Sequence, residues 1–93
     1  MATLLEHAIN VSAAFPSQEP VFLGALANVF WPDADWLRAR VNRHNGGARR
    51  GARVAGAMAG KLEKAGYLRM SSDLPRSYLI RHDATAQAAA ARQ

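Results

Sequence analysis

Four basic side chains share one side of a helix that the sequence predicts over residues 48–65. At about 100° per residue they fall within a sector of about 80°. They are Arg50, Arg53, Lys61 and Lys64. A guanidinium can hold guanine or phosphate with two parallel hydrogen bonds, and an ammonium binds phosphate as a point charge. A helix fits the major groove of duplex DNA, so this cationic face indicates a polyanionic ligand.

The charges are divided unevenly along the chain. Residues 1–37 carry four acidic and no basic side chains, whereas residues 38–93 carry all twelve Lys and Arg and three acidic ones. The formal net charge of +5 therefore hides a strong asymmetry. We expect one part of the surface to meet a polyanion and the acidic N-terminal part to serve as scaffold or partner surface.

The residues needed for several other chemistries are missing. The chain has no cysteine, and its three histidines, His7, His44 and His82, are not spaced as metal ligands. No glycine-rich phosphate loop or Ser/His/Asp arrangement occurs either. We therefore expect no enzymatic activity, no cofactor and no metal.

The chain has 93 residues, the size of one domain. It lacks the basic start and apolar run of a signal peptide, and no apolar stretch has the length of a membrane span. The expectation is a protein of the cytoplasm, without membrane contact and associated with the nucleoid if it binds DNA.

Two helices are predicted before the first tryptophan. Thr3 and Glu6 have the spacing of a capping box, which starts a helix over residues 3–14 that Phe15-Pro16 ends. A second helix is predicted to start at residues 17–20 and to end at Trp31-Pro32. Its apolar stripe would consist of Phe22, Leu26, Val29 and Phe30.

A third helix is predicted from the N-cap Asp33 to the turn Asn45-Gly46-Gly47. Its last turns carry Arg38, Arg40 and Arg43, where the helix dipole favours cations.

The helix over residues 48–65 is the fourth, and Gly66 closes it. Its apolar face would consist of Val54, Met58, Leu62 and Ala65. Another face is almost entirely small, with Gly56 and Ala59 among its members, which predicts that something approaches the backbone closely there.

A hairpin follows the fourth helix. Residues 67–70 and 78–81 favour strands, and residues 71–77 have the composition of a seven-residue tip. The alanine-rich tail, residues 84–93, is either helical or disordered. The expected fold is mainly α with a small β-hairpin: one domain over residues 1–83, with about four helices and a two-stranded wing.

The run Gly60-Lys61-Leu62-Glu63-Lys64-Ala65-Gly66-Tyr67-Leu68-Arg69-Met70 resembles the end of the recognition helix and the first wing strand of MarR-like winged helix-turn-helix proteins. The resemblance implies sequence-specific binding of double-stranded DNA by a small bacterial or phage transcription regulator. The fourth helix would enter the major groove, and residues 67–82 would form the wing.

Eight residues are expected to contact DNA. They are Arg43, Arg49, Arg50, Arg53, Lys61, Lys64, Arg69 and Arg76. A homodimer, and a protein partner at the acidic N-terminal half, are further expectations. The alternative is a protein-binding module on the same fold, a phage-type inhibitor or assembly factor of a host complex. RNA binding is the third alternative, weakened because no exposed aromatic platform is evident on the hairpin.

Overall fold

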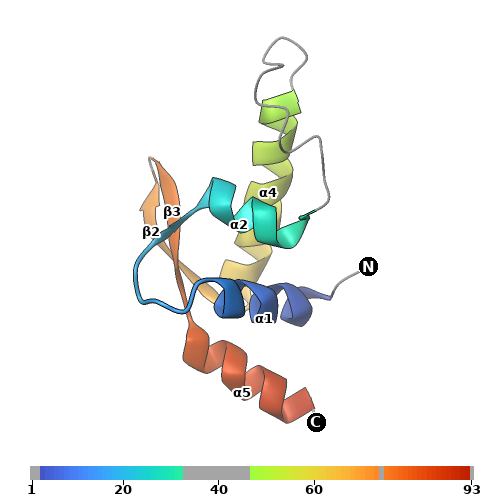
Figure 1. The fold of residues 1–93 in the computed structure, drawn as a ribbon, viewed down its shortest axis with the longest axis vertical. Helices are drawn as coiled ribbons and strands as arrows, with labels where there is room; N and C mark the ends of the chain where they lie inside the picture. Colours follow the sequence, from blue (N-terminus) through green and yellow to red (C-terminus); the bar gives the residue numbers. More distant parts are fainter. Residues whose placement is uncertain (1–2, 33–46, 74, 93) are drawn as a thin grey trace.

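The computed structural model describes residues 3–32, 47–73 and 75–92, without the side chains of residues 47–52. In this part of the chain, four helices accompany a three-stranded antiparallel sheet (Figure 1). The elements are α1 (Leu4–Ala14), β1 (Val21–Phe22), α2 (Leu23–Phe30), α4 (Gly47–Lys64), β2 (Leu68–Asp73), β3 (Arg76–Ile80) and α5 (His82–Arg92). The expected class, mainly helical with a small β element, is confirmed, and the sheet has one strand more than the predicted hairpin.

α1 begins and ends where the sequence predicts. The hydroxyl oxygen of Thr3 accepts a hydrogen bond from the backbone N–H of Glu6 at 3.2 Å, and the Glu6 carboxylate accepts one from the backbone N–H of Thr3 at 3.3 Å. This reciprocal cap gives partners to N–H groups that the helix itself cannot satisfy. Hydrogen bonding from Thr3 also lowers the pKa of Glu6. Phe15 closes the helix through a backbone bond to Val11.

The segment before α2 is a strand and not the start of a helix. The sequence predicted a helix from residues 17–20, but α2 begins at Leu23. Val21 and Phe22 pair with β3 instead. This pairing overrides local preference because it gives the backbone groups hydrogen-bond partners in a distant strand. The predicted end of the second helix is confirmed, since α2 stops at Phe30.

The hairpin is longer, and its tip shorter, than composition predicts. β2 and β3 pair from Leu68 opposite Ile80 to Asp73 opposite Arg76, with one register shift on the way. The predicted seven-residue tip over residues 71–77 is therefore wrong. Antiparallel strands with one solvated face accept polar residues, so a serine-rich stretch can continue the ladder. The strand order is β1-β3-β2.

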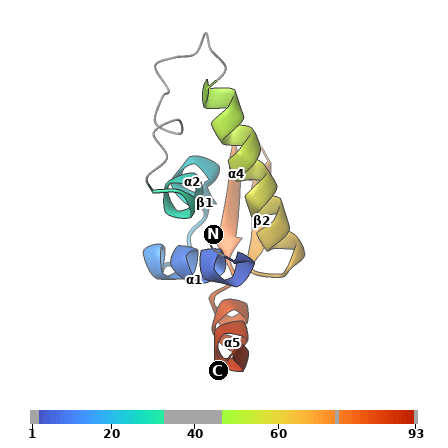
Figure 2. The same cartoon turned by 90° about the vertical axis from the view of Figure 1, so that its right-hand side faces the viewer.

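The core lies between the sheet and the helices α1, α2 and α4. Its largest fully buried side chains come from four elements: Val11, Leu26, Leu62 and Tyr78. Figure 2 shows α2 and α4 on the same side of the sheet. The opposite face of the sheet is covered by none of these three helices.

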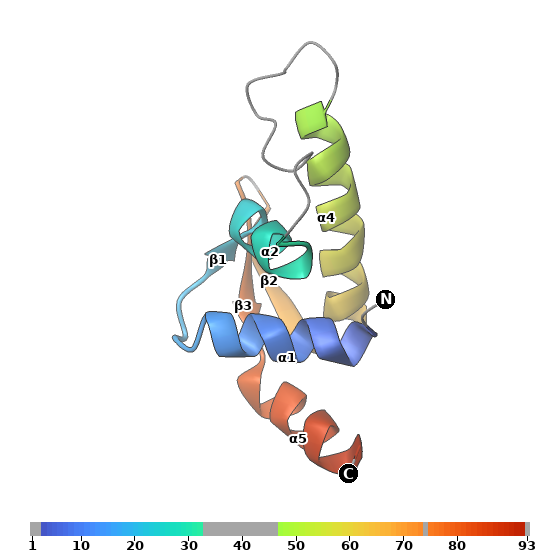
Figure 3. The ribbon, with the colours of Figure 1, turned by 45° about the vertical axis from the view of Figure 1, so that its right-hand side comes forward.

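The alanine-rich tail forms a helix, α5, that packs on α1 (Figure 3). Of the two alternatives for residues 84–93, helix is the one found, and it begins two residues earlier, at His82. The imidazole Nδ1 of His82 lies 2.6 Å from the hydroxyl oxygen of Ser12 on α1. Its Nε2 lies 3.1 Å from the carbonyl oxygen of Ser17. One side chain thus joins α5 to α1 and to the segment that follows α1.

The predicted third helix, with Arg38, Arg40 and Arg43, lies outside the described residues. None of the described helices has the length and apolar character needed to cross a membrane. Among residues 3–32, 47–73 and 75–92, no three His, Asp or Glu side chains gather where they could hold a metal ion.

Candidate nucleic-acid interface

α4 packs on the core through a different face from the one predicted. Its buried side chains are Ala55, Ala59 and Leu62. Of the predicted stripe, Leu62 is buried, Val54 and Met58 are half-buried, and Ala65 is exposed. The helical period favoured the larger side chains, whereas small alanines allow α2 to lie close to α4. The apolar face is therefore rotated away from the cationic side chains.

The cationic face of α4 is exposed. Arg53, Lys61 and Lys64 all lie at the surface. At about 100° per residue, they occupy the side of the helix opposite Ala55 and Leu62. None of the three forms an ion pair with a residue that the structure describes. Their charge is therefore available to an external polyanion.

Two predicted contacts lie near the start of α4. Arg49 and Arg50 lie within the helix, and the structure describes their backbone only. By helical position, Arg50 belongs to the same sector as Arg53. Arg43, the remaining predicted contact before α4, lies outside the described residues.

A shallow open hollow lies between the cations of α4. It is lined by Ala57, Gly60, Lys61, Glu63 and Lys64. A Cβ built on Gly60 would meet no atom within 4 Å, so the backbone is open to solvent there. A ligand can approach the helix backbone closely at this point, between two ammonium groups and beside the Glu63 carboxylate.

Arg76 turns toward α4 rather than outward from the hairpin. Its guanidinium lies so close to Gly56 that a Cβ there would be 2.7 Å from Nη1. The guanidinium carbon is 5.5 Å from the centroid of the Tyr78 ring. The Nε atom is buried and has no hydrogen-bond partner in the described part of the chain. The predicted close approach to the small face of α4 is confirmed at Gly56, and Arg76 is what approaches.

Arg69 lies apart from the cations of α4, on the sheet. It is exposed and stands opposite Leu79 in the β2–β3 ladder. With Arg81 and His82 it lines a second hollow, at the junction of the sheet and α5. The structure therefore divides the predicted contacts into a set on α4, an inward-turned Arg76 and a separate arginine on the sheet.

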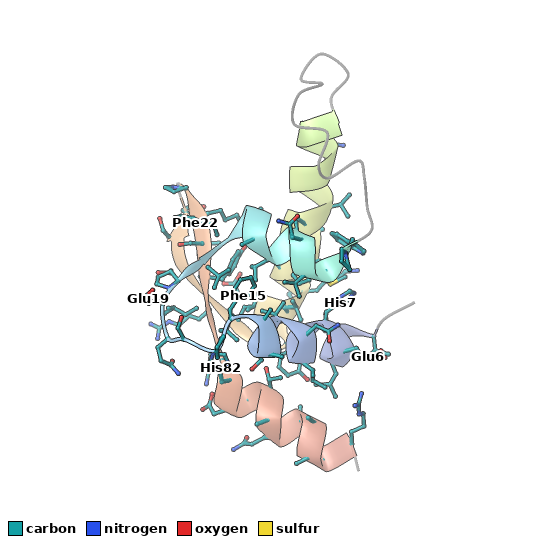
Figure 4. All side chains as sticks on the ribbon, viewed as in Figure 1. Glu6, His7, Phe15, Glu19, Phe22 and His82 are labelled. Carbon is teal, nitrogen blue, oxygen red and sulfur yellow. The ribbon has the colours of Figure 1, made fainter. Side chains whose placement is uncertain are left out.

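Phe22 is a surface residue that the sequence reading assigned to the core. Its side chain is 59% exposed, although it was predicted to belong to the apolar stripe of the second helix. Figure 4 shows it beside the hairpin, away from buried His7. The sequence contains one indication of this exposure: Val21-Phe22 is a β-prone pair. In a strand, neighbouring side chains point to opposite faces, so one of the two is expected to be exposed.

His7 is buried among aromatic side chains. Its ring meets the rings of Phe30 and Trp31 edge-on, with centroids 5.4 and 6.3 Å away. Its Nδ1 atom is buried without a hydrogen-bond partner among the described residues. Burial lowers the pKa of this imidazole, and the nearby Glu6 carboxylate opposes the effect to a smaller extent.

Comparison of the chain with protein-family models, with curated proteins and with solved structures finds no significant match.

Proposed function

We propose that this protein binds double-stranded DNA through the exposed cationic face of α4. The observation that carries the proposal is the arrangement of Arg53, Lys61 and Lys64. They are exposed on the side of α4 opposite its buried residues, and no described residue neutralises them. A helix with one buried and one exposed face can pack on the core and still enter the major groove of DNA.

The order of the elements supports a winged helix-turn-helix as the finer description of the fold. A short strand precedes α2, and the long helix α4 runs into the hairpin β2–β3, which pairs back with β1. The hairpin is the wing in this description. A winged helix-turn-helix of this size fits a small regulator of transcription, which is the role we propose.

The side chains divide the work of binding. Arg53 lies nearer the start of α4, the end of a recognition helix that meets base edges, and its guanidinium can hold guanine bidentately. Lys61 and Lys64 bind phosphates, and their contacts fix the orientation of the helix. The small residues Ala57 and Gly60 keep the hollow between them free of bulk. Arg49 and Arg50, whose positions lie in the first turn of α4, are further proposed contacts.

The test is a fluorescence anisotropy titration of a labelled duplex at several salt concentrations. Binding should weaken linearly on logarithmic axes as salt rises, because phosphate contacts release counterions. The double variant Lys61→Glu/Lys64→Glu should weaken binding at least tenfold. The matched control is Arg92→Glu on α5, an exposed charge reversal away from α4, which should bind as the wild type does.

Absence of duplex binding at low salt, or equal affinity of the wild type and the α4 double variant, would overturn the proposal. A stoichiometric complex with an acidic protein, combined with no affinity for duplex DNA, would favour the protein-binding module instead.

A further inference from the structure

One face of the sheet carries a second set of exposed side chains. Phe22 stands opposite Ser77 on β3, and Arg69 stands opposite Leu79. Side chains alternate along a strand and cross-strand partners share a face, so Phe22, Ser77, Arg69 and Leu79 lie on one face, on which Ser77 is buried. Val21 and Tyr78, which are buried, lie on the other. We name the first of these the outer sheet face, defined by Phe22, Arg69, Leu79 and Arg81.

The aromatic ring on this face is unusually exposed. Phe22 is the one large hydrophobic side chain that the described part of the chain leaves exposed, at 59%. The benzyl group has no polar atom for water to bind, so contact with a flat apolar partner would be favourable. Phe22 lines an open hollow together with residues at the start of α2 and with Pro75 and Arg76, and its ring remains mostly exposed there.

Two guanidinium groups accompany the ring. Arg69 and Arg81 are exposed, and neither forms an ion pair with a described residue. They line one hollow, whose lining also includes Leu79, His82 and the acidic residue Asp83. With strands about 4.8 Å apart and about 3.4 Å per residue, the Cα atoms of Phe22 and Arg69 are separated by about 12 Å. The ring and the cations can therefore bind one short, extended ligand.

We propose that the outer sheet face binds single-stranded nucleic acid. A base stacks on Phe22, and the backbone phosphates that follow it lie against Arg69 and Arg81. An exposed aromatic ring and exposed cations on one face of a sheet suit unpaired bases, whose flat faces are accessible. The bases of a duplex stack on each other and cannot use Phe22 in this way. This inference is independent of the proposed duplex site, because it uses β1, β2 and β3 and none of the cations of α4.

The test measures binding of the full chain to labelled twelve-nucleotide oligo(dT) and oligo(U), with unlabelled duplex as competitor. Phe22→Ala should weaken binding by about fivefold or more, the effect of losing one stacked base. Phe22→Trp, which keeps an aromatic ring at this position, should bind the oligonucleotides as the wild type does. Arg69→Gln/Arg81→Gln should weaken binding and reduce its salt dependence, by about 0.7 in logarithmic slope for each lost phosphate contact.

The matched control is Lys61→Glu/Lys64→Glu, which should retain the wild-type response to Phe22→Ala. Phe22 is exposed and β1 pairs through its backbone, so Phe22→Ala should fold, which circular dichroism can verify. Equal oligomer affinities of the wild type and Phe22→Ala would overturn the proposal. It would also be overturned if the protein bound neither oligonucleotide but formed a concentration-dependent dimer that Phe22→Ala abolishes. The outer sheet face would then bind a second copy of the chain.

Discussion

The Nδ1 atom of His82 lies 2.6 Å from the hydroxyl oxygen of Ser12, and this hydrogen bond joins the first residue of α5 to α1. The second imidazole nitrogen faces the Ser17 carbonyl oxygen at 3.1 Å, so both nitrogens have partners. If Nε2 carries the proton, it donates to Ser17 and Nδ1 accepts from Ser12. An isolated helix of eleven residues is marginal in water, so the attachment of α5 depends on contacts of this kind.

Ser12→Ala should therefore loosen α5. We expect the free energy of unfolding to fall by about 0.5–1.5 kcal/mol, and amide exchange to accelerate over residues 82–92 more than over α4. Hydrogen-exchange mass spectrometry measures the second effect. The matched control is Ser17→Ala, which keeps the carbonyl that His82 contacts. Equal exchange in α5 of wild type and Ser12→Ala would contradict this role.

The buried imidazole of His7 should make the fold sensitive to mild acid. Burial lowers its pKa in the folded chain below the ordinary value of 6.5. As pH falls below 6.5, the unfolded chain takes up a proton that the folded chain resists, so the free energy of unfolding decreases. Urea unfolding at pH 7 and pH 5 should show a larger loss for the wild type than for His7→Leu. Identical losses would show that another group is responsible.

Two glycines near the end of α4 should respond in opposite ways to alanine. Gly66 has φ of +91°, and a Cβ there would meet no atom within 4 Å, so its cost is conformational alone. Gly66→Ala should lower the free energy of unfolding by about 1–2 kcal/mol. Gly60 lies within α4 with equally open surroundings. Gly60→Ala should raise the free energy of unfolding by about 0.5–1 kcal/mol, because glycine is less favourable than alanine inside a helix. Chemical denaturation of both variants checks the contrast, and a stable Gly66→Ala would contradict it.

Removal of one ammonium from α4 should change the salt dependence of duplex binding. If Lys64 contacts one phosphate, Lys64→Ala should reduce the logarithmic salt slope by about 0.9 and weaken binding to all sequences alike. Arg92→Ala, which removes an exposed charge from α5, should leave the slope unchanged. An unchanged slope for Lys64→Ala would exclude this residue from the interface.

Local signals in the sequence predicted much of the fold. The Thr3/Glu6 cap fixed the start of α1, and Gly66 fixed the end of α4 through its positive φ. The strand β1 was missed because two residues carry no periodicity, and only pairing with β3 makes them a strand. The buried face of α4 was misassigned because Ala55 and Ala59 carry little hydrophobic signal. Their importance arises from close helix packing, a tertiary effect.

The candidate site was predictable to the extent that it depends on helical position. The exposure of Arg53, Lys61 and Lys64 follows from the pattern of α4. The direction of Arg76 does not, because it depends on the space that Gly56 leaves on another element. The exposure of the Phe22 ring follows from the register of β1 against β3. Local sequence patterns do not predict that register, because it depends on a distant strand.

The contact between Arg76 and Gly56 has a mechanical consequence. It connects the tip of the hairpin to the middle of α4, in addition to the covalent turn at Gly66. Two attachments at separate points restrain the hairpin more than the turn alone would. A flexible ligand that spans both elements would therefore have to bend to match their spacing, and the energy needed for that bending would contribute to selectivity.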